Sequence, residues 1–163
     1  MDGIFHVVRA FESDEVVHVD DSVDPIRDLE TIVSELCLKD LGMLESAVQK
    51  ETESVRKEKG LGRKAEVPLS DAFKGTMDKV RTLLESNTAV SCGSFTNTEI
   101  DIVKDKFELI TTKPIIYCVN LSKRDYIRKR NKWLGKIGDW VKAHGGGGKK
   151  RTRSGRERGR GAK

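Results

Sequence analysis

The sequence predicts a helix-rich α/β fold in which a long helical hairpin is inserted into an incomplete parallel sheet. Two short runs, 4–8 and 115–119, are apolar and rich in β-branched or aromatic residues, as buried parallel strands are. Between them, apolar residues recur at three- and four-residue steps over 26–48 and 73–84, which predicts two amphipathic helices. We therefore expect four units: two parts of a sheet domain at 1–23 and 91–144, the helical insertion at 24–90 and a tail at 145–163.

The first helix has a clear start signal. Ser22 or Asp24 can cap it, and Pro25 suits the first helical position. The segment 50–63 is charged and ends in two glycines, which is typical of an exposed turn. The second helix is therefore expected to run back along the first as a hairpin or short coiled coil.

Two further helices are expected on either side of the second strand. Thr96 and Glu99 have the spacing of a capping box, which predicts a helix over 96–110. After the strand, an apolar and aromatic stripe is expected on one last helix, where its helical spacing favours core packing over base stacking. The stripe comprises Tyr126, Ile127, Trp133, Leu134, Ile137, Trp140 and Val141.

Charge is distributed unevenly along the chain. Residues 149–163 hold eight Lys or Arg and one Glu, a net charge of 8 − 1 = +7, so residues 1–148 carry 5 − 7 = −2. The tail contains one apolar residue, Ala162, and burial cannot offset the entropy of ordering it. We expect the tail to be disordered.

Cysteine and histidine usage argues against a metal or redox centre. Cys37, Cys92 and Cys118 are widely separated in apolar surroundings, which favours reduced, structural thiols. The three histidines have no ligand neighbour at metal-binding spacing, and no nucleophile has a credible base. Without a signal peptide or an apolar run near the roughly 20 residues that span a bilayer, we expect a cytoplasmic protein without membrane contact.

The residues that follow the second strand are the most informative for binding. Asn120 is the first polar group past the strand, at the edge of the sheet where nucleotide-binding α/β proteins hold their ligands. Its amide can offer both a donor and an acceptor to a base. The same Asn-Leu-Ser also suits an ordinary strand–helix junction with Ser122 as the helix cap, and spacing alone favours the cap.

Four stretches together resemble the Obg-like ATPase (YchF-type) family of translation-factor P-loop NTPases. They are DGIFHVVRAFESDEVVHVDDSVDPIRDLETI, TNTEIDIVKDKFEL, TTKPIIYCVN and NLSKRDYIRKRNKWL. The resemblance covers roughly residues 2–142 in unbroken order, and the combination of SVDPIRDLE with KPIIYCVNLS is more specific than either alone.

The resemblance implies an incomplete P-loop NTPase (G-domain) sheet with an inserted helical coiled coil. It further implies binding of a purine nucleotide, ATP with Mg²⁺ in preference to GTP, and association with the ribosome and translation. Asn120 and Leu121 carry over as base-binding residues, with Ser122 and Lys123 at the rim of the base site. Family members have an acidic residue where Lys123 stands; because lysine only donates hydrogen bonds, guanine selectivity is not expected.

Neighbouring residues have simpler interpretations. Asp125 is acidic but comes two positions late, so it is expected to point elsewhere. Lys123 itself is expected to be an exposed residue of the first helical turn.

The sequence lacks the G-x-x-x-x-G-K-[ST] loop that binds phosphates. GLGRK at 60–64 has no apolar strand before it and is interpreted as a loop. The family's switch II is expected before Met1 and its TGS domain after residue 142. We therefore expect an internal fragment of the family that binds nucleotide weakly and does not hydrolyse it alone.

Two other functions stay open. An RNA- or ribosome-binding adaptor would use the basic helix and the tail, because exposed cations bind phosphate without sequence selectivity. Its expected contacts are Arg124, Arg128, Lys129, Arg151, Arg153 and Arg156. The tail can equally be a solvated end, and residues 24–90 alone would suit a coiled-coil module that binds a protein partner.

Overall fold

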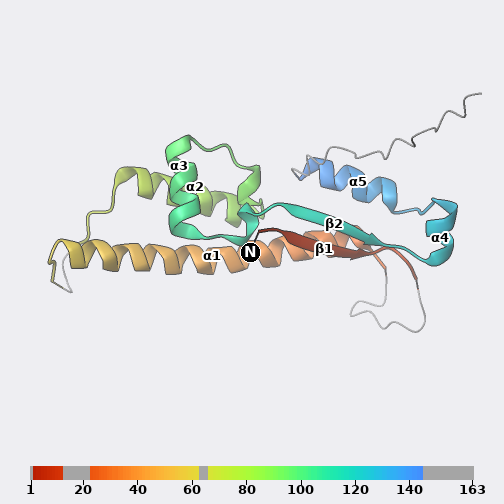
Figure 1. The fold of residues 1–163 in the computed structure, drawn as a ribbon, viewed down its shortest axis with the longest axis horizontal. Helices are drawn as coiled ribbons and strands as arrows, with labels where there is room; N and C mark the ends of the chain where they lie inside the picture. The colour runs from red at the N-terminus through yellow and green to blue at the C-terminus, as the bar shows by residue number, and fades with distance from the viewer. Residues whose placement is uncertain (1, 13–22, 63–65, 145–163) are drawn as a thin grey trace, which may run out of the picture.

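The computed structural model describes residues 2–12, 23–62 and 66–144. Its elements are β1 (Ile4–Arg9), α1 (Pro25–Glu58), α2 (Asp71–Glu85), a 3₁₀ turn (Val90–Cys92), α3 (Asn97–Ile102), a π turn (Val103–Phe107), a second 3₁₀ turn (Ile110–Thr112), β2 (Ile115–Asn120), α4 (Lys123–Arg128) and α5 (Leu134–Ala143). Helix α1 runs along the long axis of the molecule; α2 and α3 lie along one half of it, and the sheet and α5 along the other (Figure 1).

Both predicted strands are present, and they pair side by side in parallel. The register runs from Ile4 opposite Ile115 to Arg9 opposite Asn120. On one face of this sheet Val8 packs with Leu29 of α1 and with Ile137 and Trp140 of α5. The chain thus has the expected helix-rich α/β character, with a sheet of two strands in the described residues.

The prediction that these strands are buried on both faces is wrong. On the face opposite α1 and α5, Phe5 is 72%, Val7 64% and Ile116 55% exposed. The described helices cover only one side of the sheet, so alternate residues of each strand remain in solvent.

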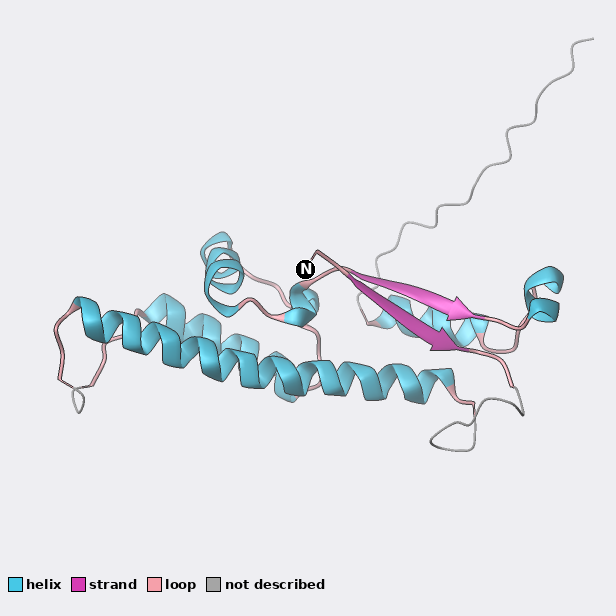
Figure 2. Ribbon diagram, turned by 60° about the horizontal axis from the view of Figure 1, so that its bottom comes forward, coloured by secondary structure: helices cyan, strands magenta, loops and turns pink. Residues whose placement is uncertain are grey.

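The predicted helical hairpin is confirmed. Asp24 caps α1, its Oδ1 accepting hydrogen bonds from the backbone N–H groups of Ile26 and Arg27 at 3.1 and 3.3 Å. Ser70 caps α2, which runs back beside α1 (Figure 1 and Figure 2). The facing sides share one apolar core, which includes Leu44, Phe73, Val80, Leu84 and Phe107. Coiled-coil pairing with a partner stays a prediction.

The first helix is longer than predicted. The charged segment expected to form a turn from residue 50 continues as helix to Glu58, because its Glu, Lys and Arg residues are good helix formers. The chain turns only at Gly60, whose φ of 60° suits glycine. At 1.5 Å per residue, α1 is about 50 Å long. Residues 60–62 of the GLGRK stretch therefore lie in the hairpin turn, as interpreted.

The predicted capping box is confirmed at the start of α3. Thr96 Oγ1 accepts from Glu99 N at 3.4 Å, and Glu99 Oε2 accepts from Thr96 N at 2.7 Å. The Glu99 carboxylate also accepts hydrogen bonds from Lys79 Nζ at 3.0 and 3.2 Å. The hydrogen bond from the Thr96 backbone, followed by the one from Lys79, lowers the pKa of Glu99. The helix is shorter than predicted, because it widens into the π turn and ends at Glu108, whose φ is 50°.

The prediction of a single last helix is also wrong. Lys129, with a φ of 52°, ends α4, and α5 begins only at Leu134. Tyr126 and Ile127 are 74% and 68% exposed on α4 and do not belong to the core. Trp133, Ile137, Trp140 and Val141, on and before α5, pack in the core beneath the sheet as expected, whereas Leu134 lines a cavity instead.

A buried carboxylate on α1 holds the chain that leads into β2. Asp40 is fully buried, and its two oxygens accept hydrogen bonds from Ile110 N at 2.8 Å and Thr111 N at 2.7 Å. Thr111 in turn accepts a hydrogen bond from Val90 N at 3.2 Å. Three segments distant in sequence are thereby joined at one point.

The cysteines are only partly as predicted. Cys37 is buried, and burial, followed by the charge of Asp40, raises the pKa of its thiol to about 11. Cys92 and Cys118 are exposed, so the expectation of structural thiols is wrong for these two. All three are unpaired.

None of the described helices is long and apolar enough to cross a membrane. The predicted disorder of the tail at 145–163 concerns residues outside the described part of the chain.

Replacing Asp40 with alanine is expected to destabilise the protein by about 2–4 kcal/mol, because two buried N–H groups lose their charged acceptor. Urea unfolding followed by circular dichroism measures this loss. Glu45→Ala, at an exposed position of the same helix, is the control and should change stability by less than about 0.5 kcal/mol. Equal stabilities of the two variants would contradict the role of Asp40.

Acidification is expected to destabilise the fold through His6. Burial lowers the pKa of His6 below its ordinary value of 6.5, so the unfolded chain takes up a proton at a higher pH than the folded chain does. The stability that the fold gains by keeping His6 neutral is complete above pH 6.5. It is lost as the pH falls through the lowered pKa of His6 in the folded state. Urea midpoints between pH 8 and 5 should fall less for His6→Gln than for the unsubstituted chain, whereas the exposed-site variant His144→Gln should retain the full dependence.

Candidate base-binding site at the strand ends

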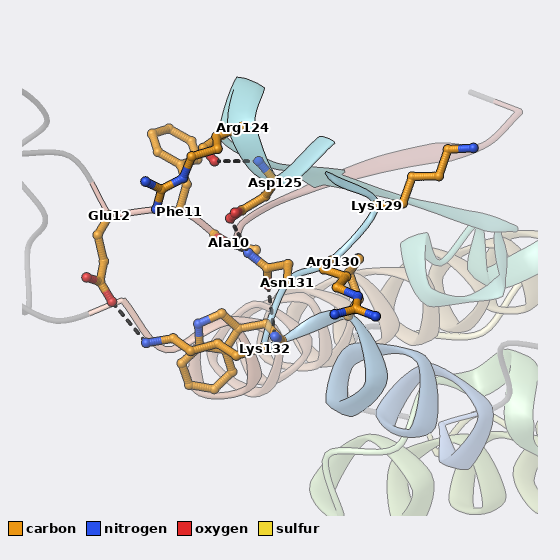
Figure 3. A pocket seen from close by; sticks show the side chains of 12 residues that line it. Ala10, Phe11, Glu12, Arg124, Asp125, Lys129, Arg130, Asn131 and Lys132 are labelled. Carbon is orange, nitrogen blue, oxygen red and sulfur yellow. Dashed lines mark hydrogen bonds and ion pairs between the residues drawn. The ribbon is translucent and has the colours of Figure 1, made fainter. Parts of the chain in front are cut away.

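A cavity of about 1070 Å³ lies where the two strands end (Figure 3). Its walls come from the chain just after β1, from α4 and from the link between α4 and α5. They comprise Ala10, Phe11, Glu12, Ser122, Arg124, Asp125, Lys129, Arg130, Asn131, Lys132, Trp133 and Leu134. This is the carboxyl edge of a parallel sheet, the place where α/β proteins bind ligands.

The amide of Asn120 is free at this edge. Asn120 is exposed, and its side chain makes no hydrogen bond with another described residue, while its backbone oxygen accepts from Ala10 N at 2.9 Å. Leu121 is half-buried and packs against the core beneath the sheet. Neither residue belongs to the lining of the cavity. Of the two predicted base-binding residues, Asn120 is therefore the one with an unused polar side chain.

Ser122 caps α4, as its spacing favoured. Its hydroxyl accepts a hydrogen bond from Asp125 N at 3.1 Å, which satisfies one of the free N–H groups of the first turn. Lys123 is exposed in that turn, in agreement with its simpler interpretation. Of the two predicted rim residues, Ser122 thus caps the helix and Lys123 is an exposed residue of its first turn.

Asn131 organises the cavity, although the sequence did not single it out. Its Nδ2 donates to Ala10 O at 2.8 Å and to Asp125 Oδ2 at 2.9 Å, and its Oδ1 accepts from Trp133 N at 2.8 Å (Figure 3). It therefore ties the end of β1 to α4 and to the start of α5. Asp125 points to Asn131, as expected for an acidic residue outside the base motif. The one available signal was an asparagine within a basic run that interrupts the helical pattern.

The cationic side chains around the cavity do not converge. Lys132 Nζ pairs with Glu12 at 3.0 Å, whereas Lys129 extends away from the other labelled side chains (Figure 3). Trp133 contacts cations as well, with Lys132 and Lys136 lying 5.4 and 5.1 Å from its ring centre. The geometry offers several separate positive charges and no compact cluster of them.

The cavity does not fit a magnesium triphosphate. Its two carboxylates are already engaged, Glu12 with Lys132 and Asp125 with Asn131. No group of three His, Cys, Asp or Glu side chains in the described ranges is placed to hold a metal ion. No step of nucleotide hydrolysis can therefore be assigned to these residues.

The predicted RNA contacts lie in two places. Arg124, Arg128 and Lys129 are exposed on and just after α4, and two of them, Arg124 and Lys129, line the cavity. Arg151, Arg153 and Arg156 fall outside the described residues, and their role stays a prediction.

No protein-family model matches the chain. Curated relatives nevertheless match nearly all of it. Obg-like ATPase 1 of Oryza sativa subsp. indica is 44% identical over 146 residues, 90% of this chain and 35% of its own length. Obg-like ATPase 1 of Saccharomyces cerevisiae is 43% identical over 141 residues, and that of Rattus norvegicus 45% over 143.

A solved structure supports the same relationship. The YchF GTPase of Schizosaccharomyces pombe superposes with a TM-score of 0.66 at 36% identity, over 90% of this chain and 38% of the other. The chain thus spans little more than a third of the proteins it matches. The identities and the shared fold confirm the resemblance of the sequence motifs, and this chain belongs to the Obg-like ATPase (YchF-type) family.

Proposed function

We propose that this chain binds a purine nucleoside through its base at the strand ends and does not hydrolyse ATP by itself. The observation that carries the proposal is the free amide of Asn120 at the carboxyl end of the parallel pair. Membership of a family whose relatives are named as an ATPase or a GTPase supports a nucleotide as the ligand.

Adenine is the better-matched base. An asparagine amide can donate to N7 and accept from N6 of adenine. Guanine reading needs a carboxylate that accepts from the base, and Lys123 stands where relatives were expected to have one. The relatives carry both ATPase and GTPase in their names, so base preference is a property to measure for this chain.

Affinity is expected to come from the base alone. Much of the binding energy of a nucleotide comes from charge-assisted hydrogen bonds to its phosphates, which need convergent donors. The cavity supplies scattered cations, and its two carboxylates, Glu12 and Asp125, are already engaged. In this proposal, the binding of ATP with Mg²⁺ belongs to the longer relatives and not to this chain. The proposed setting of the chain is translation in the cytoplasm.

Isothermal titration should show adenosine binding more tightly than guanosine, and MgATP binding within about threefold of adenosine. Asn120→Ala is expected to weaken adenosine binding at least about tenfold, since it removes hydrogen bonds worth over 1 kcal/mol. Asn97→Ala, at the exposed start of α3, is the control and should bind as the unsubstituted chain does. Submillimolar MgATP binding with turnover would overturn the proposal.

A second candidate function, an RNA- or ribosome-binding adaptor, is favoured by the exposure of the cations on α4. Segment 123–132 holds six Lys or Arg against the single acid Asp125. Because the cations that line the cavity diverge, they suit an extended polyanion better than a compact ligand (Figure 3). The exposed ring of Tyr126 lies among them and could stack on a base.

RNA binding is expected to depend on salt through α4. For a fluorescent single-stranded RNA, the double variant Arg124→Ala/Arg128→Ala should bind more weakly, with the slope of log K against log salt smaller by about 1.4, or 0.7 per lost contact. Lys39→Ala/Lys50→Ala removes two exposed lysines of α1 and should leave the slope unchanged. Loss of all binding on removal of residues 145–163, with no effect of the α4 variant, would assign the RNA contact to the tail instead.

A further inference from the structure

Two of the three cysteines, Cys37 and Cys92, lie on neighbouring segments of the fold, although they are far apart in the sequence. Val33, Cys37 and Asp40 share one face of α1, because residues three and four positions apart are neighbours on a helix. Val33 and Cys92 line the same cavity, of about 950 Å³, beside the turn that follows α2. The turn that carries Cys92 therefore lies close to α1 on one side of Cys37.

A chain of hydrogen bonds joins the same turn to α1 on the other side of Cys37. Thr111 N donates to Asp40 Oδ2 at 2.7 Å, and Val90 N donates to Thr111 Oγ1 at 3.2 Å. Val90 begins the 3₁₀ turn that ends at Cys92, and its side chain packs in the same buried cluster as Cys37. Cys37 thus lies between the two places where this turn approaches the helix.

Electrostatics agree with this placement of the two sulfur atoms. The charge of Cys92 contributes, after burial and the charge of Asp40, to the raised pKa of the Cys37 thiol. Shifts of this kind come from charges that are close to the titrating group.

The two thiols differ in their access to solvent. Cys92 is exposed, whereas Cys37 is fully buried and, with a pKa of about 11, is protonated at neutral pH. Oxidants therefore reach Cys92 first, since susceptibility follows exposure and thiolate character. The other exposed thiol, Cys118, lies on the opposite face of the sheet, because its neighbours Tyr117 and Val119 pack on the covered face.

We propose that a peroxide oxidises Cys92 and that Cys37 resolves the product as an intramolecular disulfide. In the first step the O–O bond of the peroxide breaks and one oxygen is transferred to the sulfur of Cys92, which gives a sulfenic acid and water. In the second step the sulfur of Cys37 displaces the hydroxyl group, which leaves with the Cys37 proton as water while the S–S bond forms. The two thiols together lose two electrons, and both oxygens of hydrogen peroxide end as water.

Oxidation changes which element Cys92 holds. In the reduced chain its S–H donates to His144 O at 3.4 Å, which links the turn after α2 to the end of α5. The disulfide removes this donor and ties the turn to α1 instead. Disulfides of cytosolic proteins are usually transient and redox-sensing, which suits the proposed setting of this chain.

Peptide mapping of the full chain tests the proposal directly, because trypsin places each cysteine on a separate peptide. The chain is treated with equimolar hydrogen peroxide, free thiols are blocked with N-ethylmaleimide, and the peptides are analysed without reduction. The expected product is a monomer in which peptide 28–39 is linked to peptide 82–104 and Cys118 carries the maleimide. Linkage of Cys118, disulfide-bonded dimers in place of the monomer, or the absence of any linked pair would overturn the proposal.

Matched variants test the order of the two steps. Cys37→Ala removes the resolving thiol, so labelling of Cys92 by dimedone, which traps sulfenic acids, should rise at least about tenfold. Cys92→Ser, at an exposed position that leaves the core intact, should slow the oxidation of Cys37 at least about tenfold. Cys118→Ser is the control and should form the disulfide as the unsubstituted chain does. Thermal melts establish that each variant folds.

Equal dimedone labelling of Cys92 with and without Cys37 would contradict a resolving role for the buried thiol. Oxidation of Cys37 at an unchanged rate in Cys92→Ser would contradict the exposed thiol as the first target. Either result overturns the proposal.

Discussion

The hydrogen bonds of Asp40 are the constraint on which the arrangement of this molecule depends. A carboxylate buried in a helix is costly unless its oxygens are satisfied, and the backbone N–H groups of Ile110 and Thr111 satisfy them. The chain enters β2 three residues after the 3₁₀ turn that these groups begin. The helical hairpin thus fixes where the second strand starts, and through it where Asn120 ends the strand.

The features that follow from local chemistry could be predicted from the sequence. The caps at Asp24, Thr96 and Ser122 need only a side chain that reaches a backbone group within three residues, and each is present. The hairpin follows from apolar periodicity, since both helices bury the stripe that the pattern marks. Parallel pairing was implied by two apolar runs that are separated by helices.

The features that depend on long-range contacts could not be predicted. Asp40 meets its partners 70 and 71 residues further along the chain, and Asn131 meets Ala10 at a separation of 121. The break between α4 and α5 falls on Lys129, a residue type with no particular preference for a positive φ. Whether a strand is covered on one face or both is decided by other segments, which is why the exposure of Phe5 and Val7 was missed.

The positions of the two tryptophans have a practical consequence. The chain contains only Trp133 and Trp140. The first lines the cavity beneath two lysines; the second is buried in the core and stacks on the exposed ring of His144, with 4.0 Å between ring centres. Intrinsic emission therefore combines one half-exposed fluorophore at the strand ends with one shielded fluorophore beneath the sheet. Replacing either indole by phenylalanine would separate the two signals, so that occupancy of the cavity and integrity of the packing can be followed optically without attaching a dye.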